Sequence, residues 1–595
     1  MDQPNTTDSP SGQYPSSLPT VGLGPHFEMH PFVFPAGALT VISLVLVCFL
    51  VPADDLQQTM TDIRDGIGRQ FGWMYVGMMS GLLAFSAWLA FGPYRHVKLG
   101  RDDESPEFNR LTWFAMLFSA GMGIGLLFYS VAEPTSHFQD PPPGFADGLD
   151  PSRLAMAVTI FHWGLHPWAL YAVVALALAY FGFRLEMPLN FRSLLYPVFG
   201  DRVWGRLGDV VDTLAIISTL VGVATSLGIG AQQVNAGLTY LFGIPSGIGV
   251  QILLIALITS VATISVVAGL HGGIRRLSEL NIGLAILLMV IVAVGGGLTK
   301  FFGASIENVG AYLQILPFNS FRTGAFSTEG QTWLNGWTVF FWAWWIAWSP
   351  FVGMFIARVS RGRTIQEFII GVLLVPTAVS ILWFTAFGTT TLRQHTDHID
   401  RLENDAAYDP AETLPQYFVA DLDESGEIVR LPSGEIKRTE RPLTAVQYRS
   451  ETIVTEDGRD TIATLPTALF TLLEGLFRSR VLVFLSVAVA TLCVILFFIT
   501  SSDSASLVID IIACGGNPNP PVGTRLFWAI SEGLVAAALL LAGGLGALQA
   551  ASIAAALPLA IILLFACFGL VRSLSALEKP IARTSTSGEP HDRLD

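Results

Sequence analysis

The chain has 595 residues, of which 52% are hydrophobic and only 13% are charged. A single soluble core cannot bury that much apolar surface, and apolar runs long enough to cross a bilayer recur from end to end, so the composition predicts a polytopic membrane protein. The formal net charge is −14. Because the acidic excess lies in the N-terminal tail and in one large loop, it indicates no binding face, and a nucleic-acid partner is excluded.

Twelve apolar stretches are each long enough for a membrane-spanning helix. They lie at residues 33–52, 71–92, 111–131, 155–182, 208–240, 246–270, 278–299, 335–358, 367–389, 479–506, 524–546 and 548–573. Lys and Arg gather in the loops after the second, fourth, sixth and eighth stretches, so the positive-inside rule places both termini in the cytoplasm. Residues 1–32 are rich in Ser, Pro and Thr, and we expect them to be a disordered tail.

One connection, residues 390–478, is much longer than the others, and the alternation of loops places it outside the membrane. Within it, the tetrapeptide SGEI occurs twice, which predicts a β-hairpin with Gly426 and Gly434 in turns. The alternative is a calcium loop. Its first half matches Asp421, Asp423, Ser425 and Gly426. The twelfth position, however, is Pro432 where a bidentate glutamate is required.

The third stretch contains GMGIG, which places Gly121, Gly123 and Gly125 in a helix expected to lie in lipid. Glycine destabilises a helix interior by about 1 kcal/mol relative to alanine, so this cluster indicates either close helix packing or an unwound segment. A second interruption, at Trp348-Ser349-Pro350, lies five spans later. Paired interruptions of this kind are typical of transporters built from inverted repeats, and predict two five-helix units, spans 3–7 and spans 8–12.

Aromatic side chains cluster in the middle of two spans. FWAWWIAWSPF carries Trp342, Trp344, Trp345 and Trp348, and FHWGLHPWALY carries Trp163, Trp168 and Tyr171. Single tryptophans usually belong to the interfacial belt, but rings that converge in a dry cavity bind a cation that lacks N–H donors. His162 and His166 lie between these aromatic residues, and packing or hydrogen bonding explains them more simply than a proton relay does.

The tenth span ends in LFFITSSDSAS, with consecutive hydroxyls at Thr500, Ser501 and Ser502. Such hydroxyls commonly bond back to the preceding helical turn. They are also hard oxygen ligands, and opposite the carbonyls of an unwound GMGIG segment they would complete a sodium site.

The strings GMGIGLLFYSVAEP, FHWGLHPWALYAVV, FFWAWWIAWSPFVGMFIARVSRGRTIQEF and FFITSSDSAS resemble the betaine/choline/carnitine transporter (BCCT) family over nearly all of residues 33–573. The resemblance implies an all-α membrane protein with twelve transmembrane helices and a LeuT-like inverted repeat. It also implies a homotrimer in the bacterial inner membrane that takes up small quaternary ammonium solutes, with Na⁺ as coupling ion and no other cofactor. The implied organisation is a cytoplasmic tail (1–32), two peripheral helices with their loop (33–110), a first repeat (111–302), an external connection (303–334), a second repeat (335–573) and a short cytoplasmic tail (574–595).

The resemblance also assigns residues to sites. The substrate site would comprise Trp163, Trp168, Tyr171, Trp344, Trp345 and Trp348, with Phe340 and Phe355 beside the pathway. The main sodium site would comprise Ser119, Met122, Phe497, Thr500 and Ser501. A second sodium site would use Thr219 and Phe351, but Val223 replaces its other threonine. Proton-driven choline members carry an aspartate where this chain has Gly125, which favours sodium here.

Three functional hypotheses remain. The first is sodium-coupled uptake of glycine betaine, and the second is choline or carnitine uptake or exchange, including proton-driven forms. The third is a sensor that binds betaine without moving it. An enzyme is disfavoured, since no nucleophile–base pair or metal cluster lies near the aromatic residues in the sequence.

Overall fold

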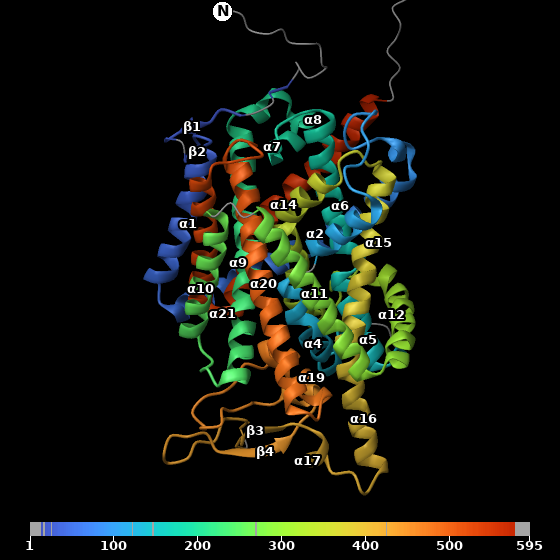
Figure 1. The fold of residues 1–595 in the computed structure, drawn as a ribbon, viewed down its shortest axis with the longest axis vertical. Helices are drawn as coiled ribbons and strands as arrows, with labels where there is room; N and C mark the ends of the chain where they lie inside the picture. Colours follow the sequence, from blue (N-terminus) through green and yellow to red (C-terminus); the bar gives the residue numbers. More distant parts are fainter. Residues whose placement is uncertain are drawn as a thin grey trace, which may run out of the picture.

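The computed structural model is a bundle of long helices that run mostly along one axis (Figure 1). The structure describes residues 14–15, 18–24, 26–121, 123–144, 148–267, 271–423 and 425–577. Part of the predicted N-terminal tail, most of the C-terminal tail and Met122 therefore lie outside the described residues.

The long helices are α1 (Val33–Leu50), α2 (Ala53–Phe91), α9 (Arg206–Phe242), α10 (Ile248–Val267), α11 (His271–Gly296), α12 (Leu298–Asn319), α14 (Thr338–Val359), α15 (Ile365–Phe384), α20 (Arg480–Ala513) and α21 (Val522–Leu577). The shorter elements are α3 (Arg110–Gly121), α4 (Ile124–Gln139), α5 (Pro151–Trp163), α6 (Leu165–Ala179), α7 (Phe191–Leu194), α8 (Tyr196–Phe199), α13 (Thr328–Gly336), α16 (Thr390–Asn404), α17 (Pro410–Thr413), α18 (Ala445–Ser450), α19 (Thr464–Leu476), β1 (Val21–Gly22), β2 (Glu28–Met29), β3 (Gln416–Ala420) and β4 (Arg438–Pro442).

Within the described residues, ten helical segments are long and apolar enough to cross a membrane. The longest, α21, contains two helices, because Gly543 and Gly544 leave the helical conformation with φ values of 152° and 61°. All of the predicted apolar stretches fall on helices, although α2 begins at Ala53 rather than at residue 71. Large apolar side chains on outer helices, such as Leu253 and Ile264 of α10, are exposed, as lipid-facing residues of a multi-pass membrane protein must be.

The glycine-rich interruption of the third span is confirmed. Helix α3 ends at Gly121, Gly123 is extended (φ −152°, ψ −175°), and α4 begins at Ile124. The backbone groups around Gly123 are therefore released from the helical hydrogen-bond pattern, which is what an ion or substrate site requires of a membrane helix.

The interruption predicted at Trp348-Ser349-Pro350 is not present, since α14 runs without a break from Thr338 to Val359. Pro350 has no N–H to offer the carbonyl of Ile346, four residues earlier. The hydroxyl of Ser349 donates to that carbonyl at 2.8 Å instead. A side chain thus replaces the missing backbone donor, and the helix continues.

A different break occurs in the fourth span, between α5 and α6, and was not predicted. Gly164 leaves the helical conformation (φ −95°, ψ −134°), and the N–H of Leu165 donates to the Tyr312 hydroxyl at 2.9 Å. A Cβ at position 164 would lie 2.7 Å from the Ile160 carbonyl oxygen and from the Tyr312 hydroxyl. The close approach of α12 therefore requires glycine here, and the break falls inside the aromatic motif.

The prediction of disorder is wrong for the described part of the N-terminal tail. Strands β1 and β2 pair antiparallel, and the N–H of His30 donates to the Ala513 carbonyl at 2.8 Å. The buried side chain of Leu18 also packs at the end of α20. These contacts tie residues 18–24 and 26–32 to the bundle.

Figure 1 shows the long connection, with α16, α17, β3 and β4, at the end of the bundle opposite to β1, β2, α7 and α8. The hairpin prediction is confirmed: Gly426 and Gly434 have φ values of 81° and 88°, and Arg430 bridges Ile436. Asp421 is engaged by Lys437 at 2.9 Å and by the Thr439 hydroxyl at 2.9 Å, and both contacts lower its pKa. These partners occupy the first carboxylate of the alternative calcium loop.

The connection is not a loop throughout. Helix α16 continues α15 through a π-helical turn at Thr385–Thr389, and α19 packs on α4 with Leu469 and Phe470 almost fully buried. Arg449, at the end of α18, reaches Ser136 of α4 at 3.0 Å. Helices α16, α18 and α19 of the connection therefore pack against the membrane helices, whereas the hairpin tip is exposed.

We expect the hairpin tip to be dispensable for substrate binding. Replacing residues 423–435 by an Asn-Gly turn leaves strands β3 and β4 paired up to Ala420 and Arg438. Apparent affinity should change by less than about threefold, roughly 0.7 kcal/mol. Phe470→Ala in α19 is the contrasting variant, because loss of a buried phenylalanine destabilises a fold by about 3–5 kcal/mol. Loss of binding in a correctly inserted tip variant would instead show that the tip covers the site.

Candidate substrate and ion site

The aromatic residues predicted from two motifs meet in the middle of the bundle. Trp163 ends α5, while Trp344 and Trp345 lie on α14. The Trp163 and Trp345 rings meet edge-on with centroids 4.8 Å apart, and Trp344 stacks on Trp345 at 5.0 Å with an interplanar angle of 10°. All three side chains are buried. We call this group, together with Trp348, the aromatic box.

The remaining predicted aromatic residues lie around the box. Tyr171 approaches Trp345 with ring centroids 6.4 Å apart, and Trp168 contacts Tyr171 at 5.6 Å. On the other side, Phe340 stacks on Trp344 at 5.6 Å. Phe355 lies near the C-terminal end of α14 and is partly buried. The Tyr171 hydroxyl and the Trp348 indole nitrogen are buried without a hydrogen-bond partner among the described residues.

A small cavity lies at the centre of the box. It is lined by Gly123, Ile124, Gly125, Leu126, Trp163, Ser226, Trp344, Trp345, Trp348 and Ser501. Its volume is about 10 Å³, close to the ~10–15 Å³ that one water molecule needs. A quaternary ammonium ion does not fit in this conformation, so the tryptophan rings must separate before the box accepts one.

Gly125 packs directly against the indoles of the box because it has no side chain. A Cβ at this position would lie 2.5 Å from Trp344 and 3.1 Å from Trp163, and ring carbons held in a packed cluster cannot retreat easily. The glycine that separates this chain from the proton-driven pattern is thus also a packing requirement of the two indoles.

A buried carboxylate that the sequence analysis did not single out orients the box. Glu133 of α4 accepts the indole N–H of Trp163 on Oε2 at 2.7 Å, and His162 Nδ1 lies 2.6 Å from its Oε1. His137 Nε2 is 3.2 Å from the same Oε1. In turn, the indole of Trp345 donates to the His162 carbonyl at 3.0 Å. Both indoles at the centre of the box are therefore fixed, directly or through His162, by Glu133.

The sequence held a signal for Glu133, since an ionisable residue inside an apolar span is a functional candidate by default. The ligand atoms of Glu133, His137 and His162 also lie within 4.8 Å of one another, a spacing that a metal ion accepts. Trp163 takes the other carboxylate oxygen, and Thr338 holds the far nitrogen of His162 at 2.9 Å. The hydrogen bonds account for this geometry, and we assign the cluster to positioning the box.

His166 has a packing role, as expected. Its ring stacks on Trp342 with centroids 5.4 Å apart, and its Nε2 lies 3.1 Å from the Ser320 hydroxyl. Trp342 thereby faces α6 and the loop after α12, away from the cavity.

The predicted sodium residues are brought together only in part. Ser501 lines the cavity beside Gly123 and Gly125, whereas the Thr500 hydroxyl donates back to the Leu496 carbonyl at 2.9 Å and leaves its lone pairs free. Phe497 is buried one turn earlier. The side chain of Ser119 and all of Met122 lie outside the described residues.

The second sodium site stays a prediction. The Thr219 hydroxyl donates to the Ala215 carbonyl within α9 at 2.7 Å, and Phe351 packs edge-on against Trp348 at 5.4 Å. Val223 is fully buried.

The sequence profile of the betaine/carnitine/choline transporters matches residues 32–423 and 444–579. This chain belongs to the betaine/carnitine/choline transporter family. A glycine betaine/proline/choline/ectoine transporter of Vibrio parahaemolyticus is 38% identical over 556 residues, which cover 92% of this chain and 88% of that protein. A glycine betaine transporter of Bacillus subtilis is 38% identical over 553 residues, with 93% and 96% covered. An uncharacterized transporter of Mycobacterium tuberculosis is 41% identical over 555 residues, with 92% and 83% covered.

Membership of this transporter family sets the enzyme hypothesis aside. The stretch between the two matched ranges, residues 424–443, contains both SGEI tetrapeptides and β4. The family profile thus covers both halves of the aromatic box, Glu133 and the hydroxyl segment of α20, and its internal gap falls on the hairpin.

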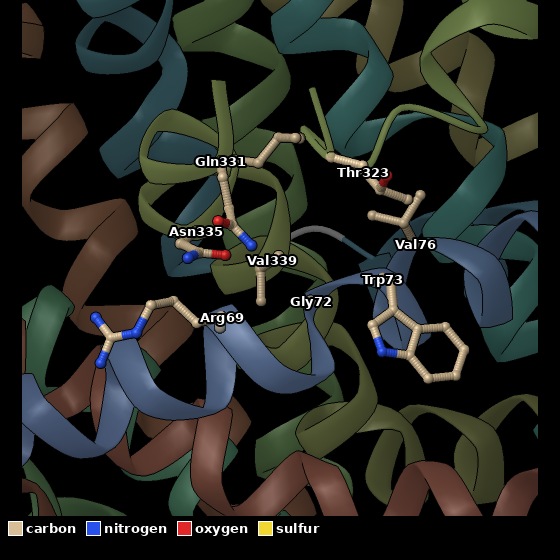
Figure 2. Close-up of a pocket in the computed structure, with 11 residues that line it drawn as sticks. Arg69, Gly72, Trp73, Val76, Thr323, Gln331, Asn335 and Val339 are labelled. Carbon is tan, nitrogen blue, oxygen red and sulfur yellow. The ribbon is translucent and has the colours of Figure 1, made fainter. Parts of the chain in front are cut away.

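A larger pocket, of about 140 Å³, lies away from the box between α2, α13 and α14 (Figure 2). Gln331 and Asn335 of α13 face Arg69 and Trp73 of α2 across it. Trp73 is the aromatic side chain that lines this pocket, whereas four tryptophans line the cavity of the box.

Proposed function

We propose that this transporter takes up a small quaternary ammonium osmolyte, glycine betaine first, by sodium-coupled symport and alternating access. The observation that carries the proposal is the aromatic box: indole rings from α5 and α14 converge on a small cavity beside an unwound segment. A methylated ammonium offers no N–H donor, and attraction to desolvated indoles is worth about 2 kcal/mol or more. The glycine betaine names of the relatives from Vibrio and Bacillus support the same substrate.

Sodium is favoured because Ser501 offers a hydroxyl oxygen beside the unwound Gly123 segment, Thr500 precedes it on α20, and position 125 carries no carboxylate. The rival proton carrier in this segment, Asp503, forms an ion pair with Arg525 of α21 at 3.0 Å. This contact supports its reading as an interhelical hydrogen-bond acceptor. Proton-coupled choline or carnitine uptake or exchange is the alternative, and the choline in the names of two Vibrio relatives keeps it open.

The proposal includes twelve spans, with the two halves of α21 and the α3–α4 pair counted as spans, and a LeuT-like inverted repeat. It also includes a homotrimer in the bacterial inner membrane with both termini in the cytoplasm. The long connection then lies outside, at the end of the bundle opposite to β1 and β2.

Substitution of Trp345 tests the box. Trp345→Leu keeps apolar bulk and removes the ring, so apparent affinity for labelled betaine should fall about tenfold or more, roughly 1–2 kcal/mol. Trp345→Phe should retain part of the affinity, since it loses the hydrogen bond to His162 but keeps a π face.

The matched control is Trp342→Phe on the same helix, since Trp342 packs on His166 outside the cavity. Its affinity should stay within about threefold of the native value. Equal affinities in the Leu and Phe variants of Trp345 would show that the box is structural. Binding without uptake in vesicles would favour a betaine sensor.

A further inference from the structure

Glu532 is a buried carboxylate that the aromatic box does not use. It lies in the first half of α21 and is fully buried. The Ser502 hydroxyl of α20 donates to its Oε2 at 2.8 Å, while its Oε1 has no hydrogen-bond partner among the described residues. Both carboxylate oxygens of Glu133 have hydrogen-bond partners, whereas one oxygen of Glu532 has none among the described residues.

The charges around Glu532 do not neutralise it. Asp503 of α20 adds a second negative charge nearby, and Arg525 is engaged by the Asp503 carboxylate at 3.0 Å and its carbonyl at 3.2 Å. Helix α10, which packs on both α20 and α21, has no titratable side chain from Ile248 to Val267. Farther along α20, Asp510 is held by the Thr524 hydroxyl at 3.0 Å. An ionised Glu532 would thus be a buried charge whose neighbouring cation, Arg525, is already paired with Asp503, which costs several kcal/mol.

We propose that Glu532 is a proton-binding site between α20 and α21, occupied in this closed conformation. A bound proton makes the group a neutral acid that accepts from Ser502 on one oxygen, and an unpaired neutral hydroxyl costs less than an unpaired charge. A metal cation would need several oxygen ligands, and among the described residues only the Ser502 hydroxyl and the carboxylate itself are in place to bind one. The chemistry of the donors therefore selects a proton over sodium.

The position of the site links it to transport, and this link rests on the proposed function. Ser501 faces the cavity of the box, and the next residue, Ser502, holds Glu532. Two consecutive residues of α20 thus place one hydroxyl at the cavity of the box and the next hydroxyl on Glu532. Movement of this segment when the box opens must change the contact of Ser502 with Glu532, and so its hold on the proton.

Infrared difference spectroscopy of the full-length protein in liposomes tests the site. Native protein at neutral pH should show the C=O stretch of a protonated carboxylic acid, which shifts in D₂O and is missing in Glu532→Gln. The amide keeps an acceptor for Ser502, so the variant should fold. Glu307→Gln removes an exposed carboxylate of α12 and should leave the band unchanged. Adding glycine betaine with sodium should shift the Glu532 band.

A spectrum in which Glu532 is ionised at neutral pH would overturn the proposal. A Glu532 that is ionised in the presence of sodium and protonated only in its absence would also overturn the proposal, and would make this a sodium site. Ser502→Ala should move the band without removing it, and an unmoved band would contradict the contact. The two proposals fail separately: a Glu532 band in a protein without betaine uptake sustains the proton site alone, and uptake without the band sustains only the transport function.

Discussion

Glu133→Gln should lower the apparent affinity for betaine by about tenfold or more, roughly 1.4 kcal/mol, although the residue does not line the cavity. The two carboxylate oxygens hold Trp163 and His162 at 2.7 and 2.6 Å. An amide offers one acceptor and one NH₂ group, which then faces an N–H. A buried donor left without an acceptor costs about 1–3 kcal/mol, so at least one indole of the box loses its fixed orientation.

A graded series separates this positioning role from general damage. His137 approaches Glu133 at the longer distance of 3.2 Å and does not link Glu133 to either central indole. His137→Asn should therefore have a smaller effect on affinity than Glu133→Gln. The loss should appear in KM and in substrate quenching of tryptophan fluorescence, with a similar thermal unfolding temperature. Native affinity in Glu133→Gln would show that packing alone orients the indoles.

The combined substitution Thr500→Ala and Ser501→Ala should raise the sodium concentration for half-maximal uptake about tenfold or more, roughly 1.4 kcal/mol. Ser501 supplies oxygen lone pairs next to the unwound Gly123 segment, Thr500 is the preceding residue of α20, and methyl groups cannot bind an alkali cation. At saturating sodium, the affinity for betaine should remain close to native, because the aromatic faces are untouched.

Two hydroxyls of the same helix provide matched controls. Ser486 donates back to Val483 at 2.9 Å and Thr491 to Val487 at 2.8 Å, as Thr500 does to Leu496, but both lie several turns from the cavity. The double variant Ser486→Ala and Thr491→Ala should leave the sodium dependence unchanged. An equal shift in both double variants would assign the effect to helix stability rather than to ion binding.

The membrane helices and the centre of the box could be predicted from sequence, because apolar runs and clustered tryptophans are visible without tertiary contacts. The break at Gly164 could not, since it depends on Tyr312 of a distant helix filling the gap. The continuity of α14 likewise depends on the rotamer of Ser349, which supplies the donor that Pro350 lacks. Glu133 was a single charge in an apolar run, and its importance became visible only when Trp163 and His162 were seen to meet it.

Sodium-driven uptake of labelled glycine betaine into proteoliposomes tests the central claim most directly. Betaine carries no net charge, so accumulation needs a co-transported cation, and each positive charge that enters draws about 2.3 kcal/mol from 100 mV of membrane potential. With an imposed negative potential, we expect uptake with an inward sodium gradient and none with a proton gradient alone. Sodium-independent uptake that follows the proton gradient and disappears in Asp503→Asn would contradict this account and place the protein with proton-driven choline transporters.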